Sequence, residues 1–151
     1  MRGDLIHLLL FSIFVAGCIQ IGTSPGHETN RQVEPGTVYI TSSGFFPKTI
    51  TITVGDKVTW INKDTAPHWI ASDVHPVHTA YPGANYDEPG SYEGSRACKG
   101  EGQPKSGAFD ACRSIAPGEN YSFTFNQTGT LFYHDHLNYY LIGSVIVKGA
   151  E

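Results

Sequence analysis

A strict two-residue alternation is the feature that most constrains the fold of this chain. Residues 49–54 read TITITV, so that three β-branched apolar side chains alternate with three threonines. An extended strand places alternate side chains on opposite faces, whereas a helix groups residues three and four apart. The segment is therefore expected to be a strand with one face toward a core, formed by Ile50, Ile52 and Val54.

Short segments of the same kind recur along the chain, and turn residues separate them. Glycine and proline contribute 17 and 9 of the 151 residues. The segments that we expect to be strands are 37–41, 48–54, 57–62, 121–126, 130–136 and 143–148. Every clear element is a strand, and this pattern favours an all-β domain built as a single sandwich.

The first 35 residues are expected to lie outside this domain. Arg2 precedes an apolar run too short to span a bilayer, which is typical of a signal peptide over residues 1–17. The small residues before Cys18 resemble a lipobox, in which the cysteine is lipidated; the alternative is an ordinary signal peptide with an incidental Cys18. Residues 18–35 are polar and read as a flexible tether. We expect a domain over residues 36–149, held outside the cytoplasm by lipidated Cys18, on the periplasmic side or at the cell surface.

A long segment, residues 72–115, shows no sustained periodicity and is rich in Pro, Gly, Tyr and Asp. Loops of this length in compact domains are usually functional or cross-linked. Cys98 and Cys112 are the only cysteines left after processing, and an oxidising compartment favours a disulfide between them, worth roughly 3 kcal/mol. The alternative is a free thiol that serves as a metal ligand.

Histidines are the candidate functional residues. Five of the seven lie at a predicted strand end or in the long loop: His68, His75, His78, His134 and His136. In a strand, His134 and His136 share one face while Asp135 points to the other. Asp135 is then either an inward ligand or a residue that orients a histidine. Because imidazole is a common ligand of copper and zinc, this grouping predicts a metal site, although surface histidines bonded to backbone would look similar.

Several stretches resemble the cupredoxins, the plastocyanin-like copper proteins. They are 45–62 (FFPKTITITVGDKVTWIN), Pro67-His68, 116–125 (APGENYSFTF), 129–133 and 143–147. The resemblance covers most of residues 37–148 except the long loop. It implies a Greek-key β-sandwich, here with a disulfide-stapled loop insertion, and it implies His68 as the first copper ligand.

The departures from the cupredoxin pattern concern the copper ligands. Asp135 falls where that family has its thiolate Cys, Asn138 on the second His and Leu141 on the axial Met. The only methionine is Met1. A blue site needs two His and one Cys, so a blue-copper centre is not expected.

Two further resemblances concern the end of the predicted strand 130–136. Residues 129–136 (GTLFYHDH) look like the Gly-Thr-x-x-Tyr-His-x-His run of multicopper oxidases, where paired histidines serve type 2 and type 3 copper in proteins of several domains. The chain is also similar to a group of cupredoxin-like proteins of bacteria and archaea with a His-Asp-His motif in place of the blue-copper ligands. This resemblance implies no particular activity.

The preferred hypothesis is a copper-binding module for carriage, buffering or delivery. Its ligands would be His68, His78, His134 and His136, with His75 or Asp135 assisting. Imidazole and carboxylate suit Cu(II) in a type 2-like site, and zinc is the alternative ion. The expected partners are the membrane, through the lipid anchor, and a copper-receiving or redox protein.

The alternatives are an electron carrier, a small copper-dependent oxidase and a metal-free adhesion domain. Loss of the Cys argues against electron transfer, nothing marks a substrate pocket, and the histidines count against a metal-free domain. The net charge of −4, without a basic cluster, argues against nucleic acid.

Overall fold

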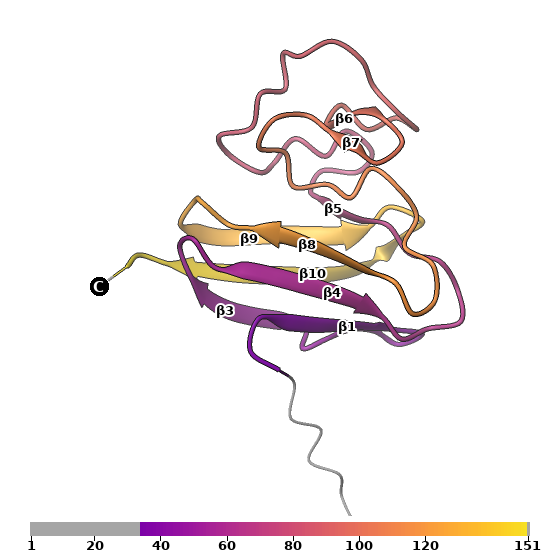
Figure 1. The fold of residues 1–151 in the computed structure, drawn as a ribbon, viewed down its shortest axis with the longest axis vertical. Helices are drawn as coiled ribbons and strands as arrows, with labels where there is room; N and C mark the ends of the chain where they lie inside the picture. The colour runs from indigo at the N-terminus through magenta and orange to yellow at the C-terminus, as the bar shows by residue number, and fades with distance from the viewer. Residues whose placement is uncertain (1–33, 151) are drawn as a thin grey trace, which may run out of the picture. The chain divides into compact units, whose positions relative to one another are not determined.

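The computed structural model describes residues 34–150, which form a β-sandwich of two four-stranded sheets (Figure 1). The strands are β1 (Thr37–Thr41), β2 (Gly44–Phe46), β3 (Thr49–Thr53), β4 (Lys57–Asn62), β5 (Ile70–Ser72), β6 (Cys98–Gly100), β7 (Gln103–Pro104), β8 (Asn120–Thr124), β9 (Gly129–Asp135) and β10 (Asn138–Lys148). One sheet has the order β2-β1-β4-β8 and the other β3-β10-β9-β5. The described residues contain no helix, so none of them offers a helical membrane span. The predicted signal peptide, Cys18 and nearly all of the predicted tether lie outside the described residues.

The predicted alternation sets the two faces of each sheet. In β3 all three threonines are exposed while Ile52 is buried, and in β4 Val58 and Trp60 are fully buried. Trp60 lies at the centre of the core, where its ring meets Tyr133 edge-on at 5.2 Å and Phe109 at 5.3 Å between centroids. Tyr133 thus fills the core, as expected. The all-β sandwich with a disulfide-stapled loop is confirmed.

The strand predictions were incomplete at three places. Residues 44–46, which lie outside the six predicted strands, form β2, because the chain reverses after Thr41 and pairs antiparallel with β1. β10 begins at Asn138 instead of Gly143, since its pairing with β9 resumes across a bulge between Asn138 and Ile142. The short strands β5, β6 and β7 lie where no strand was predicted. At two or three residues each, they are too short to show an alternation.

The long loop is fastened to the sheet β3-β10-β9-β5 on the side of β5. Figure 1 shows it, drawn from rose to orange, lying along β5 and β9. Ser72 N–H donates to the carbonyl of Phe109, and Ala111 N–H donates to that of Ile70, so the chain around Asp110 continues the sheet beyond β5. Phe109 itself is fully buried in the core, which stabilises the fold by about 1.5–3 kcal/mol.

Candidate metal centre

The two faces at the end of β9 carry polar side chains of different kinds. Tyr133 and Asp135 point into the sandwich and are completely buried. His134 and His136 lie on the opposite face of the chain, toward His78 of the long loop. The predicted alternation through His-Asp-His is thus present in the structure, with Asp135 as the inward residue.

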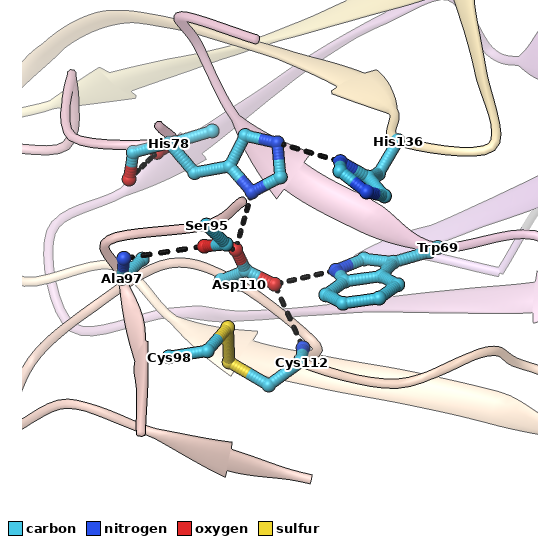
Figure 2. Close-up of a disulfide and its surroundings, with 9 residues drawn as sticks. Trp69, His78, Ser95, Ala97, Cys98, Asp110, Cys112 and His136 are labelled. Atoms are coloured by element: carbon cyan, nitrogen blue, oxygen red, sulfur yellow. Dashed lines mark hydrogen bonds and ion pairs between the residues drawn. A yellow bond between two sulfur atoms is a disulfide. The ribbon is translucent and has the colours of Figure 1, made fainter. Parts of the chain in front are cut away.

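Three histidines converge on the outer face. His78, His134 and His136 each offer one ring nitrogen within 4.8 Å of the other two. Nε2 of His78 and Nδ1 of His136 lie 3.1 Å apart, as Figure 2 shows. The exposed ring of His75 stands at the rim, its centroid 5.0 Å from that of His136 and 5.4 Å from that of His134. The structure therefore brings together four of the five predicted histidines.

Carboxylates hold two of these rings by the nitrogen farther from the centre. Nδ1 of His134 lies 2.9 Å from Asp73, and Nδ1 of His78 lies 2.6 Å from Asp110. Because a carboxylate accepts hydrogen bonds, a neutral ring donates from Nδ1 and keeps a lone pair on Nε2. Nε2 of His134 is buried and has no hydrogen-bond partner in the protein. Such an atom is rare in folded proteins, and a bound water or metal ion would satisfy it.

Burial and mutual repulsion keep two of the rings uncharged. Burial lowers the pKa of His134 despite its hydrogen bond to Asp73, and neighbouring His78 and His75 act in the same direction as burial. Burial lowers the pKa of His136 to about 4, again with help from His78 and His75. Since a metal binds the neutral form of imidazole, both rings are ready to coordinate at neutral pH.

His68 and Asp135 belong to a separate cluster inside the sandwich. Nδ1 of His68 lies 2.7 Å from Asp135, and its Nε2 lies 3.1 Å from Asp64. The other oxygen of Asp135 accepts the backbone N–H groups of Trp69 and Leu137, at 2.8 and 3.1 Å. His68 does not end a strand as expected; it lies between β4 and β5 and forms an isolated bridge with Ile115. The structure thus places neither His68 nor Asp135 with the outer histidines.

The donor set of the outer cluster fits a copper or zinc ion. It consists of three imidazoles with a fourth at the rim, and both metals accept such ligands. Cys98 and Cys112 are bonded to each other, as predicted, so the described residues offer no free thiol. The buried lone pair of His134 is the feature that such an ion would satisfy most directly.

The carboxylates that hold the histidines were not among the predicted site residues. Asp73 lies two residues before His75, and Asp110 two residues before Cys112. Neither falls in a periodic segment, and Asp110 meets His78 only through the folding of the long loop. The one signal available was the presence of acidic residues close to predicted ligands, which is weak by itself.

Comparison with known proteins identifies the fold and the family of the chain. A family model of copper-binding proteins of the plastocyanin/azurin family matches residues 37–148. A purple cupredoxin from Nitrosopumilus maritimus is 18% identical with a TM-score of 0.50, over 74% of this chain and 98% of that one. The Cu(I) form of an amicyanin mutant is 24% identical with a TM-score of 0.50, over 78% and 87%. An oxidised amicyanin mutant is 22% identical with a TM-score of 0.51, over 80% and 88%.

These structural likenesses, at identities below one quarter, concern the fold. The family model spans most of the chain and both sheets of the sandwich. The chain therefore belongs to the plastocyanin/azurin family of copper-binding proteins, with a cupredoxin domain.

Proposed function

We propose that this chain binds copper on the outer face of the sheet through His78, His134 and His136, with His75 as a fourth ligand. The observation that carries the proposal is the buried Nε2 of His134, which has no partner in the protein and belongs to a ring 5.0 Å from that of His78. An ion at this place gives that nitrogen the partner it lacks. Cu(II) with several imidazoles would form a type 2-like centre.

The proposed centre differs from the blue-copper site expected of the family. A blue site takes its colour from a copper–thiolate bond. The residue aligned with that Cys is Asp135, whose two oxygens are occupied by His68 and by backbone N–H groups. Both thiols of the domain are in the disulfide. These contacts support a non-blue centre.

Copper is preferred over zinc first because the family binds copper. Imidazole sites generally hold Cu(II) more tightly than Zn(II), so the same histidines would favour copper where both ions are present. Bound copper would supply a centre that can change between Cu(I) and Cu(II), and histidine nitrogens would hold it.

The position of the centre supports carriage, buffering or delivery. His75 is exposed, His136 is half-buried, and the ring of Tyr139, 51% exposed, lies 5.1 Å from that of His75. An ion in the centre would therefore be within reach of solvent and of another protein. A copper-receiving protein is the partner that this arrangement would suit.

We further propose that lipidated Cys18 holds the domain at the membrane, outside the cytoplasm. Two acyl chains anchor a protein far more firmly than one. Replacing Cys18→Ser should move the protein from the membrane fraction to the soluble fraction, or leave the signal peptide uncleaved. Membrane partitioning like that of the wild type, with the signal peptide removed, would contradict the anchor.

The copper proposal is tested by loading the purified protein with copper or zinc and measuring metal content, optical spectra and EPR. We expect one Cu(II) per chain, weak visible absorption and an EPR spectrum with coupling to several nitrogens. An intense copper–thiolate band would contradict the non-blue centre. No stable binding of either ion would reject the function.

A further inference from the structure

The contacts around Asp110 point to a role beyond that of a core residue. Asp110 is fully buried, and four donors converge on its carboxylate. The indole N–H of Trp69 and the backbone N–H of Cys112 donate to one oxygen at 2.6 and 2.7 Å. Ser95 Oγ and Nδ1 of His78 approach the other oxygen at 2.9 and 2.6 Å, as Figure 2 shows.

We propose that Asp110 is the positioning residue of the metal centre: its carboxylate fixes the proton of His78 on Nδ1 and leaves Nε2 as the ligand nitrogen. The role of Asp110 toward the metal rests on the proposed function, whereas the tautomer of His78 is a property of the metal-free protein. Indole and backbone N–H groups can only donate, so the carboxylate oxygen that they share must accept. The second oxygen is thereby turned toward His78.

The backbone around Asp110 makes this orientation rigid. The neighbouring Phe109 is buried in the core, and Ala71 of β5 pairs with Asp110 itself. Ala71 in turn pairs with His134 of β9. Asp110 therefore lies in the same row across the sheet as one of the proposed ligands. Its position relative to that ligand is set by backbone hydrogen bonds.

The disulfide joins the two segments that hold the carboxylate. Cys112 supplies a backbone donor to Asp110, and the bonded Cys98 follows Ala97, whose N–H donates to Ser95 Oγ at 3.2 Å. Reduction or removal of the bridge would leave the two segments joined only by weaker contacts, such as the hydrogen bond from Ser95 to Asp110. The bridge thus supports the orientation of His78 as well as the stability of the loop.

The backbone of His78 is also held in place. Its φ of 55° lies in the left-handed region, which is unfavourable for a residue other than glycine. Ser72 Oγ donates to the His78 carbonyl at 3.0 Å, and His78 N–H donates to the Val74 carbonyl at 2.8 Å. Backbone and ring of His78 are therefore each fixed by separate contacts, as a preorganised ligand requires.

The sharpest test is the isosteric substitution Asp110→Asn. Trp69 and Cys112 can only donate, so the amide oxygen must face them and the amide NH₂ must face His78. That NH₂ donates to Nδ1 and forces the ring proton onto Nε2, the ligand nitrogen. We expect the tautomer of His78 to reverse in ¹⁵N NMR of the metal-free protein, and Cu(II) affinity to fall by about 10–100-fold.

A matched control is Asp87→Asn, which makes the same change at an exposed carboxylate. It should leave the tautomer, the affinity and the nitrogen couplings in EPR unchanged. A folded Asp110→Asn variant with the wild-type tautomer and affinity would overturn the proposal. If this variant does not fold, the tautomer of His78 in the wild type tests the proposal instead. The His78 signals, assigned by comparison with a His78→Ala variant, must show the Nδ1–H form. The Nε2–H form would overturn the proposal.

These outcomes separate the two proposals. If the wild type binds no copper but His78 carries its proton on Nδ1, the function fails while the structural role of Asp110 stands. If the wild type binds copper and the variant binds it equally well through the same number of nitrogens, the function stands and Asp110 is not the positioning residue.

Discussion

Asp135 and His134 are neighbours in sequence, yet they belong to two polar sites that differ in kind. On the inner face of β9, the ring of His68 forms hydrogen bonds with the carboxylates of Asp135 and Asp64. On the outer face, His134 lies with His78 and His136, and one of its ring nitrogens has no partner. The protein itself supplies partners for both ring nitrogens of His68 in the inner site, whereas in the outer site it supplies none for Nε2 of His134.

The difference offers a general way to separate structural histidines from ligands. Both ring nitrogens of His68 face carboxylate oxygens, an arrangement that a doubly protonated ring satisfies with two hydrogen bonds. His134 and His78 have a carboxylate on one nitrogen only, the pattern seen where the other nitrogen binds a metal. The number of carboxylates around a buried histidine is thus more informative than its burial.

Removing the outer pair should have the largest effect on metal binding. The double variant His134→Ala/His136→Ala deletes two of the three converging donors, and we expect its Cu(II) affinity to fall by more than about 100-fold, beyond the range of indirect effects. Competition titration against a chelator of known affinity measures this loss. The matched control His68→Gln should bind copper nearly as well as the wild type. Equal losses in both variants would show that the inner site holds the ion.

Breaking the inner site should instead reduce stability. Asp135→Ala removes the partner of buried His68 and leaves the N–H groups of Trp69 and Leu137 without an acceptor. Loss of one member of a buried ion pair costs about 3–5 kcal/mol, which should appear in the urea midpoint of the metal-free protein. A loss below about 1 kcal/mol would mean that the inner cluster is not the stabilising contact described here.

The rim histidine should have a smaller effect than the buried ligands. His75 is exposed and has no hydrogen bond that fixes its ring, so its contribution to binding includes the cost of ordering the side chain. We expect His75→Ala to lower Cu(II) affinity by less than about tenfold and to remove one nitrogen from the EPR couplings. A loss as large as that of the outer pair would make His75 a principal ligand.

The remaining expected effect is on the pH dependence of the metal-free protein. The pKa of His136 is lowered from 6.5 to about 4 in the folded state by burial. The unfolded chain therefore binds a proton more readily, and the contribution of this ring makes stability fall as pH decreases from about 6.5 to about 4. Above that window it contributes nothing. Urea midpoints of a His136→Gln variant should vary less over this window than those of the wild type; equal slopes would contradict the shift.

The fold was predictable from the sequence because its signal is local. The alternation in residues 49–54 and in β4, together with the turns between strands, was enough to predict a sandwich. Five predicted strands lie close to their observed bounds, and the sixth, β10, starts earlier in the structure. The disulfide followed from the count of cysteines. What failed were the strands of two or three residues, since so short a segment has no period.

The site was predictable only in part because its geometry is not local. The shared face of His134 and His136 follows from strand spacing, and Asp135 was expected to point the other way. The position of His68 was inferred by analogy with a copper site whose other ligands are missing. Asp64 lies only four residues from His68, but the contact of His68 with Asp135 and that of Asp110 with His78 depend on long-range packing that no spacing in the sequence encodes.

The attachment of the long loop has a consequence for proteolysis. His78 comes from the loop, while His134 lies near the end of β9 and His136 directly follows that strand, so an ion shared among them would join loop and sheet across 56 residues of chain. Ligand binding stabilises the folded state by an amount that grows with the logarithm of the ratio of ligand concentration to Kd, and here that gain would act on the opening of the loop. Resistance of residues 79–108 to a protease would then report how much of the protein carries its metal, without any spectroscopic signal from the ion itself.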